Sequence, residues 1–237
     1  MTFDQSEFEI RCEWGRHGLE ALEPISDVVV IVDVLSFSTS VDIALGRGAI
    51  VLPFPLKDDS AARYAASRGA RLASSDRGSG FSLSPASLQT IPRGLKLVLP
   101  SPNGAALCYS AGHATVITAC IRNATASAKA AMRLGRTFAV IPAGEAWRDN
   151  SLRPAIEDLL GAGAVISTLH GSLSPDASAA ARVFERFRSH LHSALRACPS
   201  GKELIERGFG ADVDLAVQLD ASNCVARLVG RELRSLV

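Results

Sequence analysis

One short run near the start of the chain constrains the fold more than any other segment. Residues 28–32 read Val-Val-Val-Ile-Val, and Asp33 ends the run abruptly. A short, bounded, β-branched run is typical of a buried strand in a parallel or mixed sheet. Hydroxyl residues and then a segment with helical spacing follow it. The pattern predicts that Asp33 lies at the carboxyl end of a strand, where open α/β sheets bind their ligands.

The hydroxyl cluster comprises Ser36, Ser38, Thr39 and Ser40. We expect it in the turn and in the first turn of the following helix, where unpaired N–H groups and the helix dipole attract anions. A carboxylate beside an anion site would suit a metal ion and a phosphate group. The alternative is that Asp33 and Ser38 only cap the helix.

Short apolar runs alternate with helical patterns along most of the chain. Further strands are predicted at residues 49–52, 95–99, 115–118 and 137–141, and helices at 41–45, 58–67, 105–111, 124–134, 153–169 and 177–195. Pro53 and Pro55 are expected to stop the first of these strands. The pattern predicts an α/β fold with a largely parallel or mixed sheet and helices on both faces. With no long linker and no internal repeat, we expect one domain over residues 1–237.

Composition excludes several classes of function. A net charge of +1 and 5% aromatic residues argue against nucleic acid as a partner. The polar, acidic N-terminus does not resemble a signal peptide, and no apolar run is long enough to span a bilayer, so we expect no membrane partner. The five cysteines are far apart and form no C-x-x-C motif. This favours reduced thiols and a cytoplasmic location.

Polar residues recur at other predicted strand ends. Arg77 lies in a loop rich in glycine, and its guanidinium would suit phosphate oxygens, although an exposed flexible turn is the alternative. Asn103 and Gly104 follow a strand and precede a helix. Asn103 can cap that helix, or its amide and the following N–H groups can bind phosphate. Arg122 and Asn123 lie at another such junction.

Two adjacent carboxylates, Glu157 and Asp158, lie in a predicted helix that also contains Gly161 and Gly163. Adjacent residues of a helix point in different directions, so we expect one of the two to face a given site. The glycines would let this helix approach another backbone closely.

Taken in order, these segments resemble the 2-phosphosulfolactate phosphatase family, the ComB-like proteins of coenzyme M biosynthesis. The motifs that carry the resemblance are Val-Asp-Val-Leu-Ser-Phe-Ser-Thr at 32–39, the glycine loop at 76–85, Pro-Asn-Gly-Ala-Ala-Leu at 102–107, the segment 157–164 and the segment 214–220. The resemblance implies a magnesium-dependent acid phosphatase that acts on a small sulfonated phosphate ester, with an α/β fold of its own. A homodimer is compatible with it.

The chain departs from the family pattern at one notable position. The first family motif reads D-V-L-R-A-S-T, and here Ser36 stands in place of the arginine. A multiply anionic ester would then bind weakly unless another cation replaces the arginine, so we expect a preference for a less anionic phosphate ester or only feeble hydrolysis of phosphosulfolactate. Arg122, Arg148 and Arg153 are the candidates that the sequence offers.

The leading hypothesis is a metal-assisted phosphomonoester hydrolase. Asp33 and one of Glu157 or Asp158 would hold Mg²⁺, which prefers oxygen ligands. Arg77 would stabilise phosphoryl charge, and water would attack, with Ser38 as the alternative nucleophile. Substrate contacts are expected from Ser36, Thr39, Asn103, Gly104, Arg122 and Asn123. The second hypothesis is a catalytically silent small-anion-binding or assembly protein on the same fold.

Overall fold

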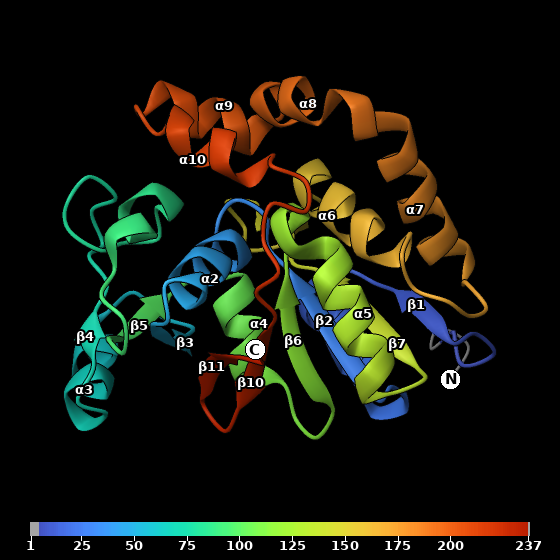
Figure 1. Cartoon of the computed structure of the whole chain (residues 1–237), viewed down its shortest axis with the longest axis horizontal. Coiled ribbons are helices and arrows are strands. Elements are labelled where there is room, and N and C mark those ends of the chain that lie inside the picture. Colours follow the sequence, from blue (N-terminus) through green and yellow to red (C-terminus); the bar gives the residue numbers. More distant parts are fainter. Residues whose placement is uncertain (1–4, 237) are drawn as a thin grey trace.

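The structure is a computed structural model that describes residues 5–236, and a nine-stranded mixed sheet forms its centre (Figure 1). The α/β fold class is confirmed. In sheet order the strands are β1 (Ile10–Cys12), β7 (Phe138–Pro142), β2 (Val28–Val32), β6 (Thr115–Ala119), β10 (Ala226–Val229), β11 (Glu232–Ser235), β3 (Ile50–Phe54), β5 (Lys96–Pro100) and β4 (Arg71–Leu72).

The sheet consists of two parallel blocks joined by an antiparallel hairpin. In the first block, β1, β7, β2 and β6 run parallel. In the second block, β3, β5 and β4 run parallel. The hairpin β10–β11 pairs antiparallel with β6 on one side and with β3 on the other. The last strands of the chain therefore fill the middle of the sheet.

Helices cover both faces of the sheet. Successive side chains of β2 point to opposite faces, and each face contributes to its own apolar core. Val28, Val30 and Val32 belong to one apolar cluster, and Val29 and Ile31 belong to another. The helices are α1 (Gly15–Leu22), α2 (Phe37–Gly46), α3 (Asp59–Ser67), α4 (Gly104–Ser110), α5 (Ala124–Leu134), α6 (Ile156–Ile166), α7 (Pro175–Phe187), α8 (Leu191–Ala197), α9 (Pro199–Glu206) and α10 (Gly210–Ala216).

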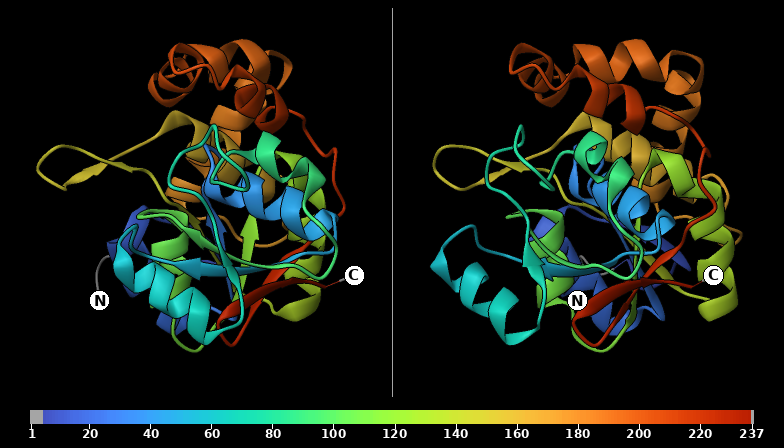
Figure 2. Two further views of the ribbon diagram at one scale, coloured as in Figure 1. Left: turned by 90° about the vertical axis from the view of Figure 1, so that its left-hand side faces the viewer. Right: turned by 60° about the vertical axis from the view of Figure 1, so that its left-hand side comes forward.

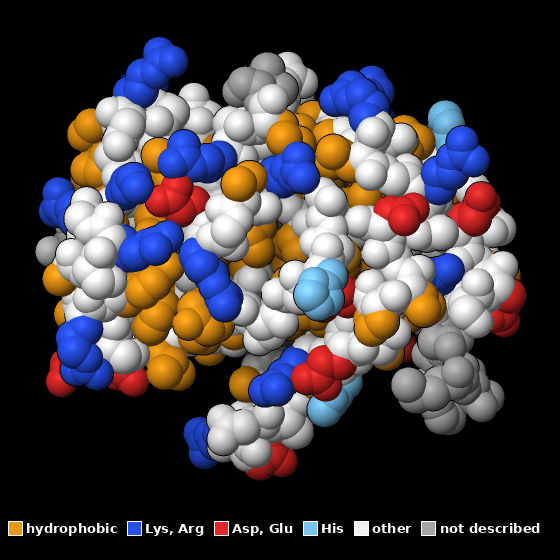
Figure 3. Space-filling model, turned by 90° about the horizontal axis from the view of Figure 1, so that it is seen from below, with side chains coloured by type: hydrophobic (Ala, Val, Ile, Leu, Met, Phe, Trp, Pro, Cys, Tyr) orange, Lys and Arg blue, Asp and Glu red, His pale blue; other side chains and the backbone are white. Residues whose placement is uncertain are grey.

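The two ends of the parallel strands differ in their surroundings. At the carboxyl ends of the first block, α8, α9 and α10 form a layer across the top of the molecule (Figure 1). A two-stranded ribbon, β8 (Glu145–Ala146) and β9 (Leu152–Arg153), projects from the body close to the same end (Figure 2). The face seen from below carries Lys and Arg side chains around a group of hydrophobic ones (Figure 3). No helix of the described residues is both long and apolar enough to cross a membrane.

Several predicted boundaries are wrong. The strand expected to stop at Pro53 continues to Phe54, because β11 pairs with β3 at Val51 and the missing N–H of Pro53 lies beyond that pairing. The helix expected over 153–169 begins at Ile156, since Arg153 precedes a proline and lies in the ribbon instead. The helix expected over 177–195 breaks after Phe187 and resumes at Leu191.

The predicted close approach of the α6 glycines is confirmed. A Cβ on Gly163 would meet the backbone carbonyl oxygen of Ala180 in α7. A Cβ on Gly161 would lie 2.6 Å from Val34 Cγ2, just beyond the end of β2. Small residues therefore let α6 pack tightly between its neighbours.

Candidate functional site

A cavity of about 630 Å³ opens at the carboxyl ends of strands from both blocks. Its wall is formed by the segments after β2, β3, β4, β5 and β7, together with α9. The charged and polar residues that line it include Asp33, Ser36, Lys57, Asp58, Asp59, Arg77, Ser101, Asn103, Glu145, Ser200, Glu203 and Arg207. The position of the cavity agrees with the general rule for ligand sites in open α/β sheets.

Asp33 lies in the cavity wall and also caps two helices. Its Oδ1 accepts a hydrogen bond from Phe37 N at 3.0 Å, at the start of α2. Its Oδ2 accepts one from Gly104 N at 2.8 Å, at the start of α4. This carboxylate therefore ties the first block to the helix that follows β5 of the second.

Gly104 is needed for this contact. A Cβ at this position would lie 2.6 Å from Phe37 Cδ1 and 2.8 Å from Asp33 Oδ2, closer than atoms normally approach. The first N–H groups of α2 and α4 thus point at the Asp33 carboxylate. This carboxylate occupies the position at the helix start where the sequence predicted a bound anion.

Most of the hydroxyl cluster serves the backbone. Ser38 Oγ accepts from Asp33 N at 3.1 Å and donates to Ile31 O at 3.4 Å. Thr39 donates to Val34 O at 2.7 Å, and Ser40 donates to Leu83 O at 3.0 Å. All three side chains are buried and lie outside the cavity lining, whereas Ser36 lines the cavity.

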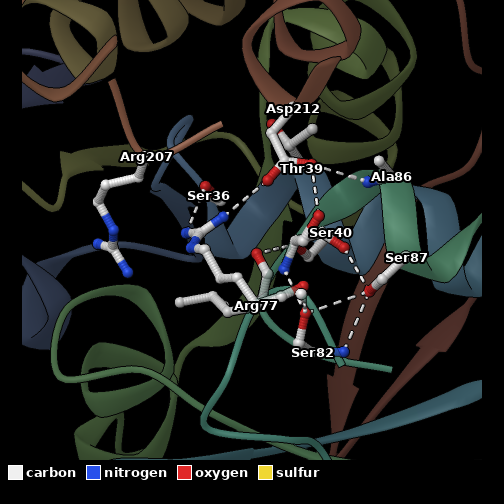
Figure 4. A network of polar contacts seen from close by, with 12 residues as sticks. Ser36, Thr39, Ser40, Arg77, Ser82, Ala86, Ser87, Arg207 and Asp212 are labelled. Carbon is white, nitrogen blue, oxygen red and sulfur yellow. Dashed lines mark hydrogen bonds and ion pairs between the residues drawn. The ribbon is translucent and has the colours of Figure 1, made fainter. Parts of the chain in front are cut away.

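Arg77 points into the site from the loop after β4 (Figure 4). Its Nη1 pairs with Asp212 Oδ2 at 2.9 Å, and its Nη2 donates to Ser36 Oγ at 2.9 Å. The side chain is 12% exposed, so the alternative of a flexible exposed turn is wrong. Burial lowers the pKa of Arg77, and the charge of Asp212 opposes this shift.

Two further cations, Lys57 and Arg207, line the cavity and were missed in the sequence. Burial lowers the pKa of Lys57, the nearby Arg77 lowers it further, and Glu145 and Asp33 oppose the change. Arg207 and Arg77 lie 5.8 and 5.9 Å from the ring centroid of Phe209. Lys57 could have been found from the sequence, because it is a cation just after a predicted strand. Arg207 could not, because nothing in the sequence shows that α9 packs beside that strand.

The acidic residues gather around Asp33 but have different partners. Asp158 accepts from Val34 N at 2.7 Å and from Gly144 N at 2.8 Å, so it holds the segments after β2 and β7. Glu157 Oε2 is buried and has no hydrogen-bond partner. Neither side chain lines the cavity, although one of them was expected to face it.

Glu145, which follows β7, also lines the cavity. Burial raises the pKa of Glu145, Asp33 raises it further, and a hydrogen bond with Asn103 opposes the shift. The Asn103 side chain makes no hydrogen bond to α4, so its expected capping role is wrong. It forms the hydrogen bond with Glu145 instead.

Burial also raises the pKa of Asp33 and Asp158. Two backbone N–H groups oppose the shift at Asp33, while Glu157 adds to it. At Asp158 the charges of Asp33 and Glu157 raise the pKa further, well above its usual value. It is therefore unfavourable for these neighbouring carboxyl groups all to be ionised in the absence of a nearby cation.

Arg122 and Asn123 lie outside the cavity lining. Arg122 Nε pairs with Asp42 Oδ2 at 2.9 Å, and its Nη1 donates to Leu215 O at 3.2 Å. Asn123 accepts from Cys120 N and donates to Cys224 O, both at 2.9 Å. Both residues join the C-terminal segment to the body of the protein.

The other two candidate cations also lie outside the lining. Arg153 reaches the wall indirectly, through a 3.1 Å hydrogen bond from Nη2 to Ser200 Oγ. Arg148 belongs to the projecting ribbon. The cations at the cavity are thus Lys57, Arg77 and Arg207 rather than the three that the sequence offered.

The acidic residues suit a metal ion by their charge, but they do not form a complete set of metal ligands. Within residues 5–236, no three His, Cys, Asp or Glu side chains are arranged to hold a metal. The unpartnered Glu157 Oε2 and the mutually repelling carboxylates nevertheless suit a cation. Mg²⁺ is commonly bound by one or two carboxylates with waters and substrate phosphates, so a two-carboxylate site fits that ion.

Comparison with known proteins agrees with the geometry. The pattern of the 2-phosphosulpholactate phosphatase family matches residues 17–231. A 2-phosphosulfolactate phosphatase of Methanothermobacter thermautotrophicus is 31% identical over 198 residues, which cover 81% of this chain and 83% of the relative. The chain therefore belongs to the 2-phosphosulfolactate phosphatase family and is a phosphoric monoester hydrolase.

Proposed function

We propose that this phosphatase hydrolyses a small phosphate monoester that carries at least one further anionic group, with Mg²⁺ as cofactor and 2-phosphosulfolactate as the first substrate to test. One observation carries the proposal: the lining of a single cavity brings together three cations and several carboxylates, namely Lys57, Arg77 and Arg207 with Asp33, Asp58, Asp59, Glu145 and Glu203. The cations would bind the negatively charged groups of such an ester, and carboxylates of the same lining would balance the positive charge of a metal ion. If the substrate is phosphosulfolactate, the reaction belongs to coenzyme M biosynthesis.

The phosphoryl group would lie beside Arg77, because the guanidinium fork matches phosphate oxygens. Ser36 and Asn103 add neutral donors nearby. Lys57 and Arg207 remain for the sulfonate or carboxylate of the ester. They supply the positive charge that the family pattern has at the position of Ser36.

Mg²⁺ would be held by Asp33 together with Glu157, whose Oε2 has no partner, or with Glu145, which shares the cavity wall. The hydrogen bonds of Asp158 to Val34 N and Gly144 N suit it to a supporting role. When bound, the ion would polarise the phosphoryl group and favour attack by water.

Water is the nucleophile that the geometry supports, because Ser38 is 1% exposed and bound to backbone groups. Water forms the new P–O bond while the ester P–O bond breaks, and the released alkoxide takes up a proton. Glu145 is the group best suited to move protons here, since its raised pKa brings it closer to neutral pH. Arg77 would stabilise the charge on the phosphoryl oxygens.

The test measures hydrolysis of phosphosulfolactate and of neutral phosphate esters with and without Mg²⁺. We expect a preference for the anionic ester that falls about tenfold in Lys57→Ala, since a charged hydrogen bond contributes about 1.5–3 kcal/mol. Lys202→Ala, an exposed lysine of α9 outside the cavity lining, is the control and should behave like the wild type. Phosphate binding without turnover of any ester, or equal activity after removal of Mg²⁺, would contradict the proposal.

A further inference from the structure

We propose that Asp212 is a positioning residue of the phosphatase site, which holds the Arg77 guanidinium in place for the phosphoryl group. The inference rests on the proposed function, because it assumes that Arg77 contacts the substrate. Asp212 lies in α10, 135 residues after Arg77 in the chain, and it is not part of the cavity lining.

Both oxygens of the Asp212 carboxylate accept hydrogen bonds within one small cluster of residues (Figure 4). Its Oδ1 accepts from Ser84 Oγ at 2.6 Å and from Ala86 N at 3.0 Å. Its Oδ2 accepts from Arg77 Nη1 at 2.9 Å. The side chain is 1% exposed, so these contacts are shielded from solvent. A buried carboxylate with this many donors has one well-defined orientation.

This orientation fixes Arg77 at two points. Nη1 is bound to Asp212 and Nη2 to Ser36, while the guanidinium has five N–H donors in a rigid planar fork. In the described part of the chain, the contacts to Asp212 and Ser36 use two of these donors. The remaining donors are free to face an anion in the cavity.

The nearby charge makes such a restraint necessary. Arg207 lies close enough to lower the pKa of Arg77, and both guanidinium groups lie against Phe209. Two like charges in one cavity tend to separate when no ligand is bound. Asp212 opposes that repulsion and keeps Arg77 in the wall before the substrate arrives. Preorganised charge of this kind favours the transition state without a cost of reorganisation.

The main alternative is that Asp212 only fastens α10 to the segment 84–86. A structural role would change the stability of the protein, whereas a positioning role changes phosphate affinity through Arg77. The test therefore uses Asp212→Asn, which keeps the size of the side chain. Its amide can still accept from Ala86 N, but it cannot pair with the guanidinium as a charge.

We expect the inhibition constant of inorganic phosphate to rise about tenfold or more in Asp212→Asn, because a charge-assisted contact is lost. The matched control is Asp214→Asn in the same helix, where a 50% exposed carboxylate pairs with Arg196 on the surface. This control should leave phosphate inhibition unchanged. A thermal unfolding curve for each variant measures the structural contribution separately.

A double-mutant cycle decides between the two roles. In the Arg77→Ala background, Asp212→Asn should cause no further loss of phosphate affinity, because its effect passes through Arg77. An equal loss in both backgrounds, or an unchanged inhibition constant in Asp212→Asn, would overturn the inference. Should Asp212→Asn fail to fold, Ser84→Ala removes one contact to the same carboxylate and is expected to raise the constant by a smaller factor.

The outcomes also separate this inference from the proposed function. An active, phosphate-inhibited wild type whose inhibition does not respond to either variant refutes the role of Asp212 alone. A wild type with neither activity nor phosphate inhibition refutes both.

Discussion

The two parallel blocks of the sheet differ in the charged residues that they bring to one cavity, since the cations Lys57 and Arg77 come from the second block alone. The first block supplies Asp33 after β2 and Glu145 after β7, with Asp158 behind them in α6. The second block supplies Lys57 after β3 and Arg77 after β4. Asp33 and Asp158 accept hydrogen bonds from backbone N–H groups, whereas Lys57 forms no ion pair within the described chain.

This difference indicates a division of labour. Carboxylates that are buried and fixed by the backbone suit a metal ion or a proton transfer, because both need a defined position. Cations on loops and helix ends suit the recognition of an anionic substrate that arrives from solvent. The contact between Asp33 and Gly104 connects the two walls directly, so changes at this contact affect both.

The largest effect is expected from Asp33→Asn, which weakens the acidic wall and leaves the cationic wall intact. Turnover should fall at least about 100-fold, the upper end of what the loss of a supporting residue costs a metal site. An asparagine cannot accept from both Phe37 N and Gly104 N, which adds a stability cost of about 1–3 kcal/mol.

Initial rates at saturating Mg²⁺ and chemical unfolding measure the two effects of Asp33→Asn. Asp176→Asn, an exposed carboxylate in the first turn of α7, is the control for the loss of one acidic group. Full turnover with unchanged Mg²⁺ dependence in Asp33→Asn would contradict the division between the walls.

Gly104→Ala should produce the next largest effect because it separates the walls without changing any charge. The new methyl group would overlap Phe37 and Asp33, and such overpacking costs about 1–3 kcal/mol. Activity should fall along with stability as the Gly104 N–H withdraws from Asp33. Gly46→Ala is the matched control, since a Cβ there meets nothing within 4 Å. If the two variants unfold at the same urea concentration, the close contact of Gly104 with Phe37 and Asp33 does not exist in solution.

The smallest effect concerns pH. An acid whose pKa is raised on folding binds protons more tightly in the folded state, so its contribution to stability falls as pH rises from its unfolded pKa towards its folded pKa. For Asp158, whose ordinary value is 3.8, stability should decline as pH rises above about 4.

The melting temperature, measured as a function of pH, should show this decline in the wild type and a smaller one in Asp158→Asn. In the wild type, Mg²⁺ should offset the decline at higher pH, by about 2.7 kcal/mol at 100 times its dissociation constant. The absence of a Mg²⁺ effect at any pH would argue against a cation beside these carboxylates. Asp33→Asn provides the comparison in which the effect of Mg²⁺ should be reduced.

The first block could largely be predicted from the sequence because its signals are local. An apolar run ending in Asp33 predicts both the strand and the position of the carboxylate. The pair Glu157 and Asp158 was identified as well, but its orientation was not, because the rotation of α6 depends on how Gly161 and Gly163 pack. The hydroxyl cluster was overvalued because the buried start of α2 needs these groups for its own backbone.

The second block and the cationic wall could be predicted only in part. Arg77 has a local signal in its glycine loop, but Arg207 reaches the site only through the packing of α9, and Asp212 only through that of α10. The hairpin β10–β11 has no helical or strand periodicity strong enough to separate it from the mixed C-terminal segment. Its place between β6 and β3 follows from pairing with strands more than 100 residues away.

The central position of this hairpin has a consequence for biosynthesis. A ribosome makes the chain from the N-terminus, so β6 and β3 are complete long before residues 226–235 emerge. Until then each block has an open strand edge that can pair with other chains. The nascent protein is therefore most prone to aggregate just before its final strands are made, and these strands close both edges together.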